Sequence, residues 1–196
     1  MSKIRTPSDA RDRIVQTAER LFYAHGVRAV GIDRIIAEAE VAKMTLYNHF
    51  SSKDDLILAV LEYREGQVDE FFRSSVERFV EEGMDRMEAF FATLKAWFDS
   101  SGFRGCSFIN ASVELADPSH PASQFVRQHK CSFREMLTEI ITEVAGKKAA
   151  LAAPAVSVLV EGAIVTAVIE GSSDSADIAK DAALTLISKA KRARGK

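Results

Sequence analysis

Residues 43 to 53 carry side chains suited to binding a nucleic acid. Lys43 and Lys53 supply positive charge that can neutralise phosphates. Thr45 and Asn48 offer donor and acceptor groups for the edges of bases, and the Tyr47 hydroxyl can reach a phosphate. These residue types at this spacing favour the major groove of a DNA duplex as the partner.

Two short helices are predicted to position these side chains, over residues 32–39 and 42–49. Their spacing is that of a helix-turn-helix. At 100° per residue, Leu46 and Phe50 lie on one side of the second helix, and Met44 lies on the opposite side. The hydrophobic side is expected to face the core and the other side to face outward. The alternative is a small helical hairpin with a solvated polar face.

The rest of the chain is predicted to be helical as well. No segment alternates apolar and polar residues over a convincing length, and only four prolines interrupt the chain. The first helix is expected to start with Ser8 as its N-cap and to end at Gly26. Besides the two short helices, we expect helices over residues 8–25, 53–82, 84–99, 107–115, 123–144, 149–170 and 176–191. The predicted fold class is therefore all-α, with about nine helices.

Charge is distributed unevenly along the 196 residues, although the net charge is only −2. Residues 1–53 hold nine lysines and arginines against six acidic residues, and residues 54–188 hold 12 against 22. Residues 189–196 add five basic residues and no acidic one. A basic head, an acidic body and a basic tail are compatible with a head that binds nucleic acid. Chance scatter of surface charge is the alternative.

Other features argue against secretion and a membrane. The two cysteines, Cys106 and Cys131, do not form a disulfide scaffold and suggest a reducing cytoplasm. The first residues contain no apolar stretch typical of a secretory signal. The longest apolar run, residues 155–169, is shorter than the roughly 20 residues of a membrane helix and contains Glu161. We therefore expect a cytoplasmic protein without a membrane span.

Enzymatic chemistry finds little support in the sequence. It contains no Glu-x-x-His pair for a helical metal site and no glycine-rich phosphate loop. Asp117 and His120 flank a proline-containing loop, and their proximity is interpreted as incidental. We expect no enzyme activity, no metal and no cofactor.

Aromatic residues are concentrated between residues 69 and 145, which hold ten of the twelve phenylalanines and the only tryptophan. Rings packed in a core explain most of them, and an apolar pocket for a small ligand is the functional alternative. Glu114 is a further polar candidate, and Cys106 is either a buried structural thiol or a redox sensor. The candidate ligand-binding residues are Phe71, Phe91, Trp97, Phe108, Asn110 and Glu161.

The predicted helix at residues 149–170 is apolar on most of its circumference. Such a helix must be buried on more than one side. Together with residues 176–187 it is expected to form half of a four-helix seam between two copies of the chain. The alternative is a monomer that buries both helices in its own core.

Residues 14–56 resemble the N-terminal domain of the tetracycline-repressor (TetR-like) family of bacterial transcriptional regulators, with the resemblance extending over about residues 8–60. Its specific part is the pattern Thr-Leu-Tyr-x-His-Phe-x-x-Lys at residues 45–53. The resemblance implies a three-helix, helix-turn-helix DNA-binding domain at residues 8–68, with the motif at about 31–50, and a C-terminal effector-binding and dimerisation domain at residues 69–196. The DNA contacts that it implies are Lys43, Met44, Thr45, Tyr47, Asn48, His49 and Lys53.

Three positions depart from the family pattern. Glu40 stands in the turn where the family usually has glycine, which costs roughly 1 kcal/mol if this residue has a positive φ. Gly31 replaces the usual Ser or Thr N-cap of the helix at 32–39. Asn48 stands where similar sequences often carry a larger residue, so the preferred operator is expected to differ.

The function implied by the resemblance is that of a ligand-responsive repressor. It would bind a palindromic double-stranded DNA operator as a homodimer formed through the last two helices, and an unknown small molecule would release it. The helix at 53–82 is expected to act as the lever, because it joins both regions. The alternative is an all-α protein that binds a small molecule and has no DNA activity.

Overall fold

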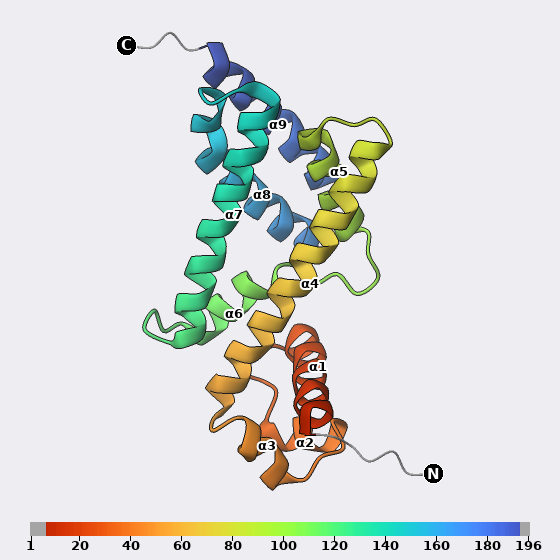
Figure 1. Cartoon of the computed structure of the whole chain (residues 1–196), viewed down its shortest axis with the longest axis vertical. Coiled ribbons are helices and arrows are strands. Elements are labelled where there is room, and N and C mark those ends of the chain that lie inside the picture. Colours follow the sequence, from red (N-terminus) through yellow and green to blue (C-terminus); the bar gives the residue numbers. More distant parts are fainter. Residues whose placement is uncertain (1–6, 193–196) are drawn as a thin grey trace. The chain divides into compact units, whose positions relative to one another are not determined.

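The computed structural model describes residues 7–192, and all regular elements within these residues are helical. This confirms the predicted all-α fold (Figure 1). Residues 193–196, which belong to the predicted basic tail, lie outside the described residues. The helices are α1 (Pro7–His25), α2 (Ile32–Glu38), α3 (Lys43–His49), α4 (Lys53–Glu81), α5 (Arg86–Phe98), α6 (Ser107–Leu115), α7 (Pro121–Ala145), the 3₁₀ turn η1 (Ala149–Ala152), α8 (Ala153–Glu170) and α9 (Asp174–Arg192).

The chain divides into two compact units. The N-terminal unit contains Met1–Gln67 and Ser107–Arg127, and the C-terminal unit contains Val68–Cys106 and Gln128–Lys196. Helices α4 and α7 have residues in both units. The N-terminal unit therefore includes α6 in addition to the helix-turn-helix, an association that the sequence pattern did not indicate.

The N-terminal unit is held together by a small apolar core under α1, α2 and α3. Ile14 and Leu21 of α1, Ile35 of α2 and Leu46 of α3 are completely buried. Truncating such a leucine or isoleucine to alanine typically costs about 2–5 kcal/mol. This core fixes the orientation of α3 within the N-terminal unit (Figure 1).

Two predicted helix starts are wrong. Helix α1 begins at Pro7, so Ser8 lies in its first turn and is not its N-cap. Helix α5 begins at Arg86, because Asp85 is its N-cap. The Asp85 carboxylate accepts hydrogen bonds from the backbone N–H groups of Met87 and Glu88, both at 2.9 Å. The Glu88 side chain accepts one in return from the Asp85 N–H, which completes a capping box.

Two further boundaries differ from the prediction. Helix α7 starts at Pro121, since a proline in the first turn sacrifices no helical hydrogen bond. Residues 149–170 do not form one α-helix, because the 3₁₀ turn η1 precedes α8.

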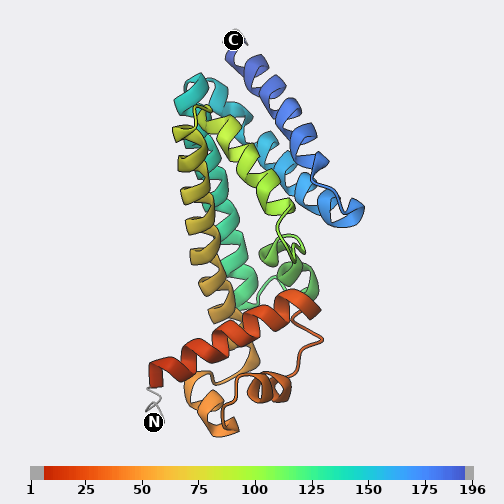
Figure 2. The same ribbon diagram turned by 90° about the vertical axis from the view of Figure 1, so that its right-hand side faces the viewer.

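In the C-terminal unit, α8 and α9 run antiparallel beside each other (Figure 2). The Ser175 hydroxyl donates to the Ala163 carbonyl at 2.9 Å in a buried hydrogen bond between them. The Lys95 ammonium pairs with Asp177 and connects α5 to α9. A ring cluster fills the interior next to these helices, with Phe90 lying 5.8 Å from Phe72 and 6.3 Å from Phe133 between ring centroids.

Ala149–Glu170 is the one candidate membrane span among the described residues. This segment has 22 residues, and an 18-residue stretch within it has a mean hydropathy of 2.0, so it meets the length that the shorter predicted run did not. A core helix of a soluble protein passes the same test, and 44% of that 18-residue stretch is buried inside the protein. Length and composition alone therefore give only weak evidence for a membrane.

Candidate nucleic-acid interface

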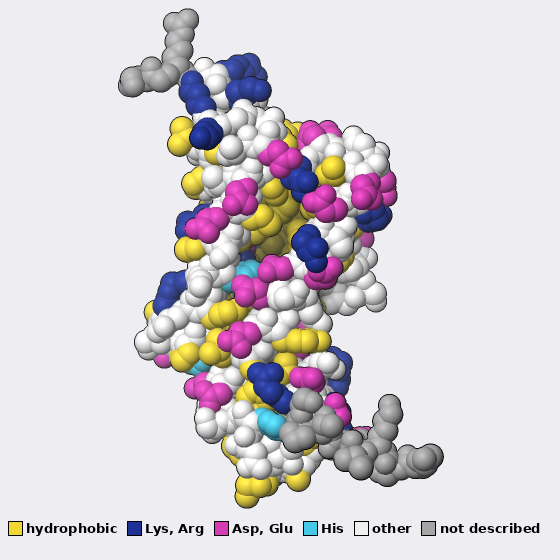
Figure 3. Space-filling view, viewed as in Figure 1, with side chains coloured by type: hydrophobic (Ala, Val, Ile, Leu, Met, Phe, Trp, Pro, Cys, Tyr) yellow, Lys and Arg dark blue, Asp and Glu magenta, His cyan; other side chains and the backbone are white. Residues whose placement is uncertain are grey.

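Helix α3 has one buried face and one exposed face, as the periodicity predicted. Leu46 and Phe50 are buried in the N-terminal unit. Met44, Tyr47 and Asn48 are exposed, and 71% of Met44 is accessible to solvent. Figure 3 shows hydrophobic side chains reaching the surface over α3. The exposed face of α3 is therefore open to a partner.

The turn before α3 adopts the conformation expected from its unusual residues. Glu40 has a φ of 51°, in the left-handed region, where a residue other than glycine costs about 1–2 kcal/mol. Gly31 occupies the N-cap of α2 with φ −84° and ψ 155°, and it provides no side-chain hydrogen bond. The backbone N–H of Val41 donates to the Ile36 carbonyl at 3.2 Å. This hydrogen bond closes the turn despite the strain at Glu40.

The two predicted phosphate-binding lysines lie in different environments. Lys43 is exposed on α3, and its ammonium lies 3.6 Å from an Asp33 carboxylate oxygen. Lys53 is half-buried at the start of α4, with its ammonium 5.9 Å from the centroid of the Phe22 ring. Burial lowers the pKa of Lys53 from its ordinary value, while Asp54 and Glu114 oppose that shift. Lys43 is thus the more accessible cation.

The remaining two predicted DNA contacts lie at the edge of the exposed face. Thr45 and His49 are half-buried. The His49 ring lies 6.4 Å from that of Phe50, between centroids. A DNA contact at either position would use only part of the side chain.

A contact that the sequence did not indicate joins α6 to the turn between α1 and α2. The backbone N–H of Arg28 donates to a Glu114 carboxylate oxygen at 3.0 Å. The Arg28 guanidinium donates to the Leu115 carbonyl at 3.1 Å. Gly26 has a φ of +91°, and a Cβ there would lie 2.7 Å from Glu114 Oε2. Glu114, a polar candidate for ligand binding, thus contacts the turn between α1 and α2.

The loop around Asp117 is a local structural feature. The Asp117 carboxylate accepts hydrogen bonds from the backbone N–H and the hydroxyl of Ser119, at 2.8 and 2.7 Å, which lower its pKa. His120 Nδ1 accepts from the backbone N–H of Ala122 at 3.1 Å, while Nε2 lies 3.3 Å from Asp54. No group of three or more potential metal ligands occurs among the described residues.

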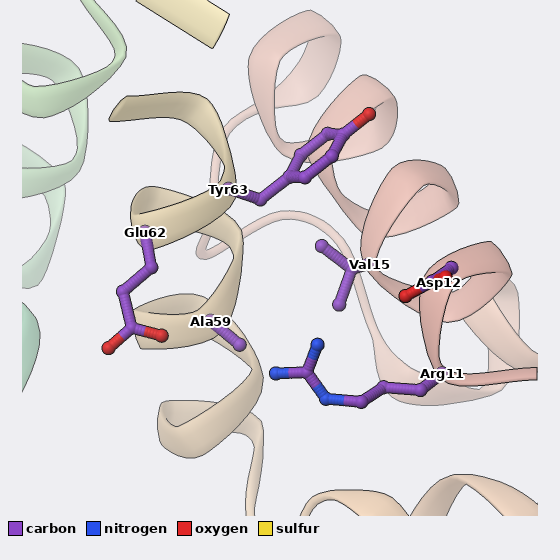
Figure 4. A pocket seen from close by; sticks show the side chains of 6 residues that line it. All are labelled: Arg11, Asp12, Val15, Ala59, Glu62 and Tyr63. Atoms are coloured by element: carbon purple, nitrogen blue, oxygen red, sulfur yellow. The ribbon is translucent and has the colours of Figure 1, made fainter. Parts of the chain in front are cut away.

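A pocket of about 280 Å³ lies between α1 and α4 in the N-terminal unit (Figure 4). Acidic, basic, aromatic and aliphatic side chains line it, and none of them is a predicted ligand-binding residue. The Arg11 guanidinium also lies 5.5 Å from the centroid of the Phe50 ring, next to α3. The lining residues are Arg11, Asp12, Val15, Ala59, Glu62 and Tyr63.

The predicted ligand-binding residues are divided between the two units. Phe108, which is buried, and Asn110, which is exposed, belong to the N-terminal unit. The other four residues belong to the C-terminal unit, where Phe91 is buried, Trp97 and Glu161 are half-buried and Phe71 is exposed.

Glu161 takes part in a polar cluster in the C-terminal unit. One of its carboxylate oxygens lies 2.7 Å from the Lys130 ammonium, which is 5.6 Å from the centroid of the Phe133 ring. The other oxygen, Oε2, is buried without a hydrogen-bond partner among the described residues. Lys130 also donates to the buried Cys106 Sγ at 3.5 Å. An ion pair beside aromatic rings can orient the polar group of an apolar ligand.

The fold and the exposed face of α3 define a helix-turn-helix protein of the DNA-binding class. Residues 14–60 match the family model of bacterial regulatory proteins of the tetR family. A TetR-family transcriptional regulator from Streptomyces coelicolor is 34% identical, with 94% of this chain and 95% of that chain aligned and a TM-score of 0.72. The chain therefore belongs to the TetR family of bacterial transcriptional regulators.

Two similar proteins regulate transcription in opposite directions. The transcriptional activator FasR of Mycolicibacterium smegmatis is 30% identical over 74% of this chain and 65% of its own length. The transcriptional repressor DhaR of a Mycobacterium species is 31% identical over 63% of this chain and 58% of its own length. In both cases the match spans less than two thirds of the relative.

Proposed function

We propose that the chain is a cytoplasmic repressor that binds a near-palindromic operator as a homodimer and leaves it when a small molecule binds. The observation that carries this proposal is the exposed face of α3 in a chain of the TetR family. Two copies would place their α3 helices in successive major grooves, roughly 34–36 Å apart. Lys43, Met44, Thr45, Tyr47, Asn48, His49 and Lys53 are the proposed DNA contacts.

The proposed dimer contact is the exposed apolar face of α8 and α9. Val158, Gly162, Val165 and Ile169 follow each other at helical spacing on α8, and all four are exposed. Ile178 of α9 is exposed as well. Aliphatic side chains on one stripe favour burial against another protein surface. A second copy presents the same stripe, which suits a two-fold symmetric contact.

The proposed effector site lies in the C-terminal unit, around the half-buried ring of Trp97 and the polar cluster of Glu161 and Lys130. Support comes from the buried oxygen of Glu161, which has no hydrogen-bond partner among the described residues. Burying a polar atom without a partner is costly, so a ligand donor at this oxygen would be favoured. Phe71 and Phe91 of the same unit remain predicted ligand-binding residues, and so do Phe108 and Asn110 of the N-terminal unit.

Effector binding can release DNA only if the effector binds one conformation of the dimer more tightly than another. We propose two connections between the effector region and the DNA-binding helices, one along the chain and one through hydrogen bonds. Helix α4 continues directly from the helix-turn-helix, and α6 contacts the turn between α1 and α2 through Glu114. A change at either connection would alter the separation of the two α3 helices.

Selection of bound sequences from random and genomic DNA with the full-length protein tests the proposal. We expect enrichment of one near-palindromic sequence, and small molecules can then be screened for release of that DNA in a mobility-shift assay. Failure to enrich any sequence would reject DNA binding. A reporter gene downstream of the selected site distinguishes a repressor from an activator such as FasR.

A further inference from the structure

Helix α3 presents an apolar side chain at a position where it cannot serve the core of its own unit. Met44 and Tyr47 are the two exposed large hydrophobic side chains in the described residues up to Gln67. Met44 is the more exposed of the two, at 71%. It is the second residue of α3, directly after the exposed Lys43. An unbranched thioether side chain is thus held at the leading end of the proposed recognition helix.

The chemistry of Met44 limits what it can recognise in a DNA major groove. It has no hydrogen-bond donor, and its sulfur is only a weak acceptor. The edges of adenine, guanine and cytosine present hydrogen-bonding groups there, whereas thymine also presents its C5-methyl group. The N-terminal residues of a recognition helix are those that contact base edges. A flexible apolar side chain at this place therefore matches the thymine methyl group better than it matches the hydrogen-bonding groups of the base edges.

We propose that Met44 contacts the C5-methyl group of a thymine in each half-site of the operator. This inference rests on the proposed DNA-binding function and adds the identity of a base to it. The same methyl group occurs on 5-methylcytosine, and we assign thymine as the natural source. Removing one buried methyl group costs about 0.8 kcal/mol, which corresponds to roughly a 4-fold loss of affinity in each half-site.

The test uses a duplex selected from random DNA by the full-length wild-type protein. Each thymine is replaced in turn, symmetrically in both half-sites, by deoxyuridine, which keeps the base pair and removes only the methyl group. We expect one position where the wild-type affinity falls about 15-fold, as two losses of about 4-fold combine. In Met44→Ala, the same replacement should change the affinity less than 2-fold. In the matched control Met84→Ala, at an exposed methionine of the C-terminal unit, the full loss should persist.

A further arm separates the methyl group from the rest of the base. At the sensitive position, the wild-type protein should bind a 5-methylcytosine–guanine pair more tightly than a cytosine–guanine pair. Met44→Ala should bind the two pairs with equal affinity. Equal deoxyuridine losses in wild type and Met44→Ala, or no sensitive thymine, would overturn the proposal while leaving DNA binding intact. Failure to select any duplex would instead overturn the proposed function, and the methyl contact with it.

Discussion

The two units present exposed surfaces of opposite chemistry. On α3 of the N-terminal unit, Tyr47 and Asn48 bring hydrogen-bonding groups to solvent beside a lysine. On α8 of the C-terminal unit, Val158 and Ile169 are 72% and 77% exposed, and the stripe they form is aliphatic. A hydrated, charged duplex suits the first surface, and another apolar protein surface suits the second. Exposure alone therefore does not identify a partner, whereas the chemistry of the exposed face does.

The largest effect is expected from breaking the apolar surface of α8. Val158→Glu combined with Val165→Glu would place four carboxylates in a symmetric contact, where burying each charge costs several kcal/mol. We expect light scattering to change from about twice the chain mass to the chain mass at micromolar concentration. Operator binding in a mobility-shift assay should disappear with it.

A matched control is available on α6 of the N-terminal unit. Val113 is as exposed as Val158, but it lies outside the proposed dimer contact. Val113→Glu should leave both the mass and the DNA affinity unchanged. A wild-type protein that is strictly monomeric at micromolar concentration would contradict the dimer.

The next effect in size concerns the polar surface of α3. Tyr47→Ala should weaken operator binding about 1000-fold, because base and phosphate contacts worth about 2 kcal/mol are lost in each of two copies. Circular dichroism should show unchanged helicity, since Tyr47 contributes to an exposed face. Tyr47→Phe removes only the hydroxyl, so its affinity for the operator should lie between those of the wild-type protein and Tyr47→Ala. Undiminished binding by the alanine variant would reject α3 as the interface.

Salt should weaken DNA binding by α3 without weakening the dimer contact of α8 and α9. If Lys43 and Lys53 contact phosphates in both copies, four counterions are released, and DNA affinity should fall about 100-fold between 50 and 200 mM salt. An apolar dimer contact does not weaken in this way, so the mass from light scattering should stay constant. DNA affinity measured by fluorescence anisotropy that is independent of salt would argue against DNA as the partner.

The association of α6 with the DNA-binding helices predicts a smaller effect on stability. Gly26→Ala should lower the free energy of unfolding by about 1–3 kcal/mol, because of the positive φ and the displaced Glu114 carboxylate. Gly66→Ala is the control, since nothing lies within 4 Å of the added Cβ and the site is helical. Gly66→Ala should raise the free energy of unfolding, measured with a denaturant, by up to about 1 kcal/mol. Equal effects of the two substitutions would mean that Glu114 is not held against Gly26.

The smallest effect is a pH dependence of ion pairs in both units. A hydrogen bond from Arg20, and a second from Arg34, lower the pKa of Glu38. A hydrogen bond from Lys95 lowers the pKa of Asp177. A carboxylate with a lowered folded pKa stabilises the fold above its ordinary pKa, and this contribution is lost as the pH falls through the folded pKa. The midpoint of thermal unfolding should therefore drop below about pH 4.5, the ordinary pKa of Glu38. Glu38→Gln should make this drop shallower, and an unchanged profile would contradict the pairing.

Much of the fold followed from local patterns along the chain. Helical periodicity and glycine positions are local properties, so they located the helices to within a few residues. The capping box of Asp85 and Glu88 was also encoded locally, although the predicted start at residue 84 did not use it. The association of α6 with the first three helices was not predictable, because it depends on contacts between segments far apart in the sequence.

By itself, the sequence determined which face of α3 is apolar, because residues at fixed spacing on a short helix share a face whatever surrounds them. Leu46 and Phe50 are buried and Tyr47 and Asn48 are exposed for this reason. The contact between Glu114 and Arg28, which are 86 residues apart, depends instead on how the helices pack. The same packing leaves Lys53 half-buried beside Phe22 while Lys43 is exposed. Burial and long-range pairing arise when helices pack together, and no local pattern specifies which side chains then meet.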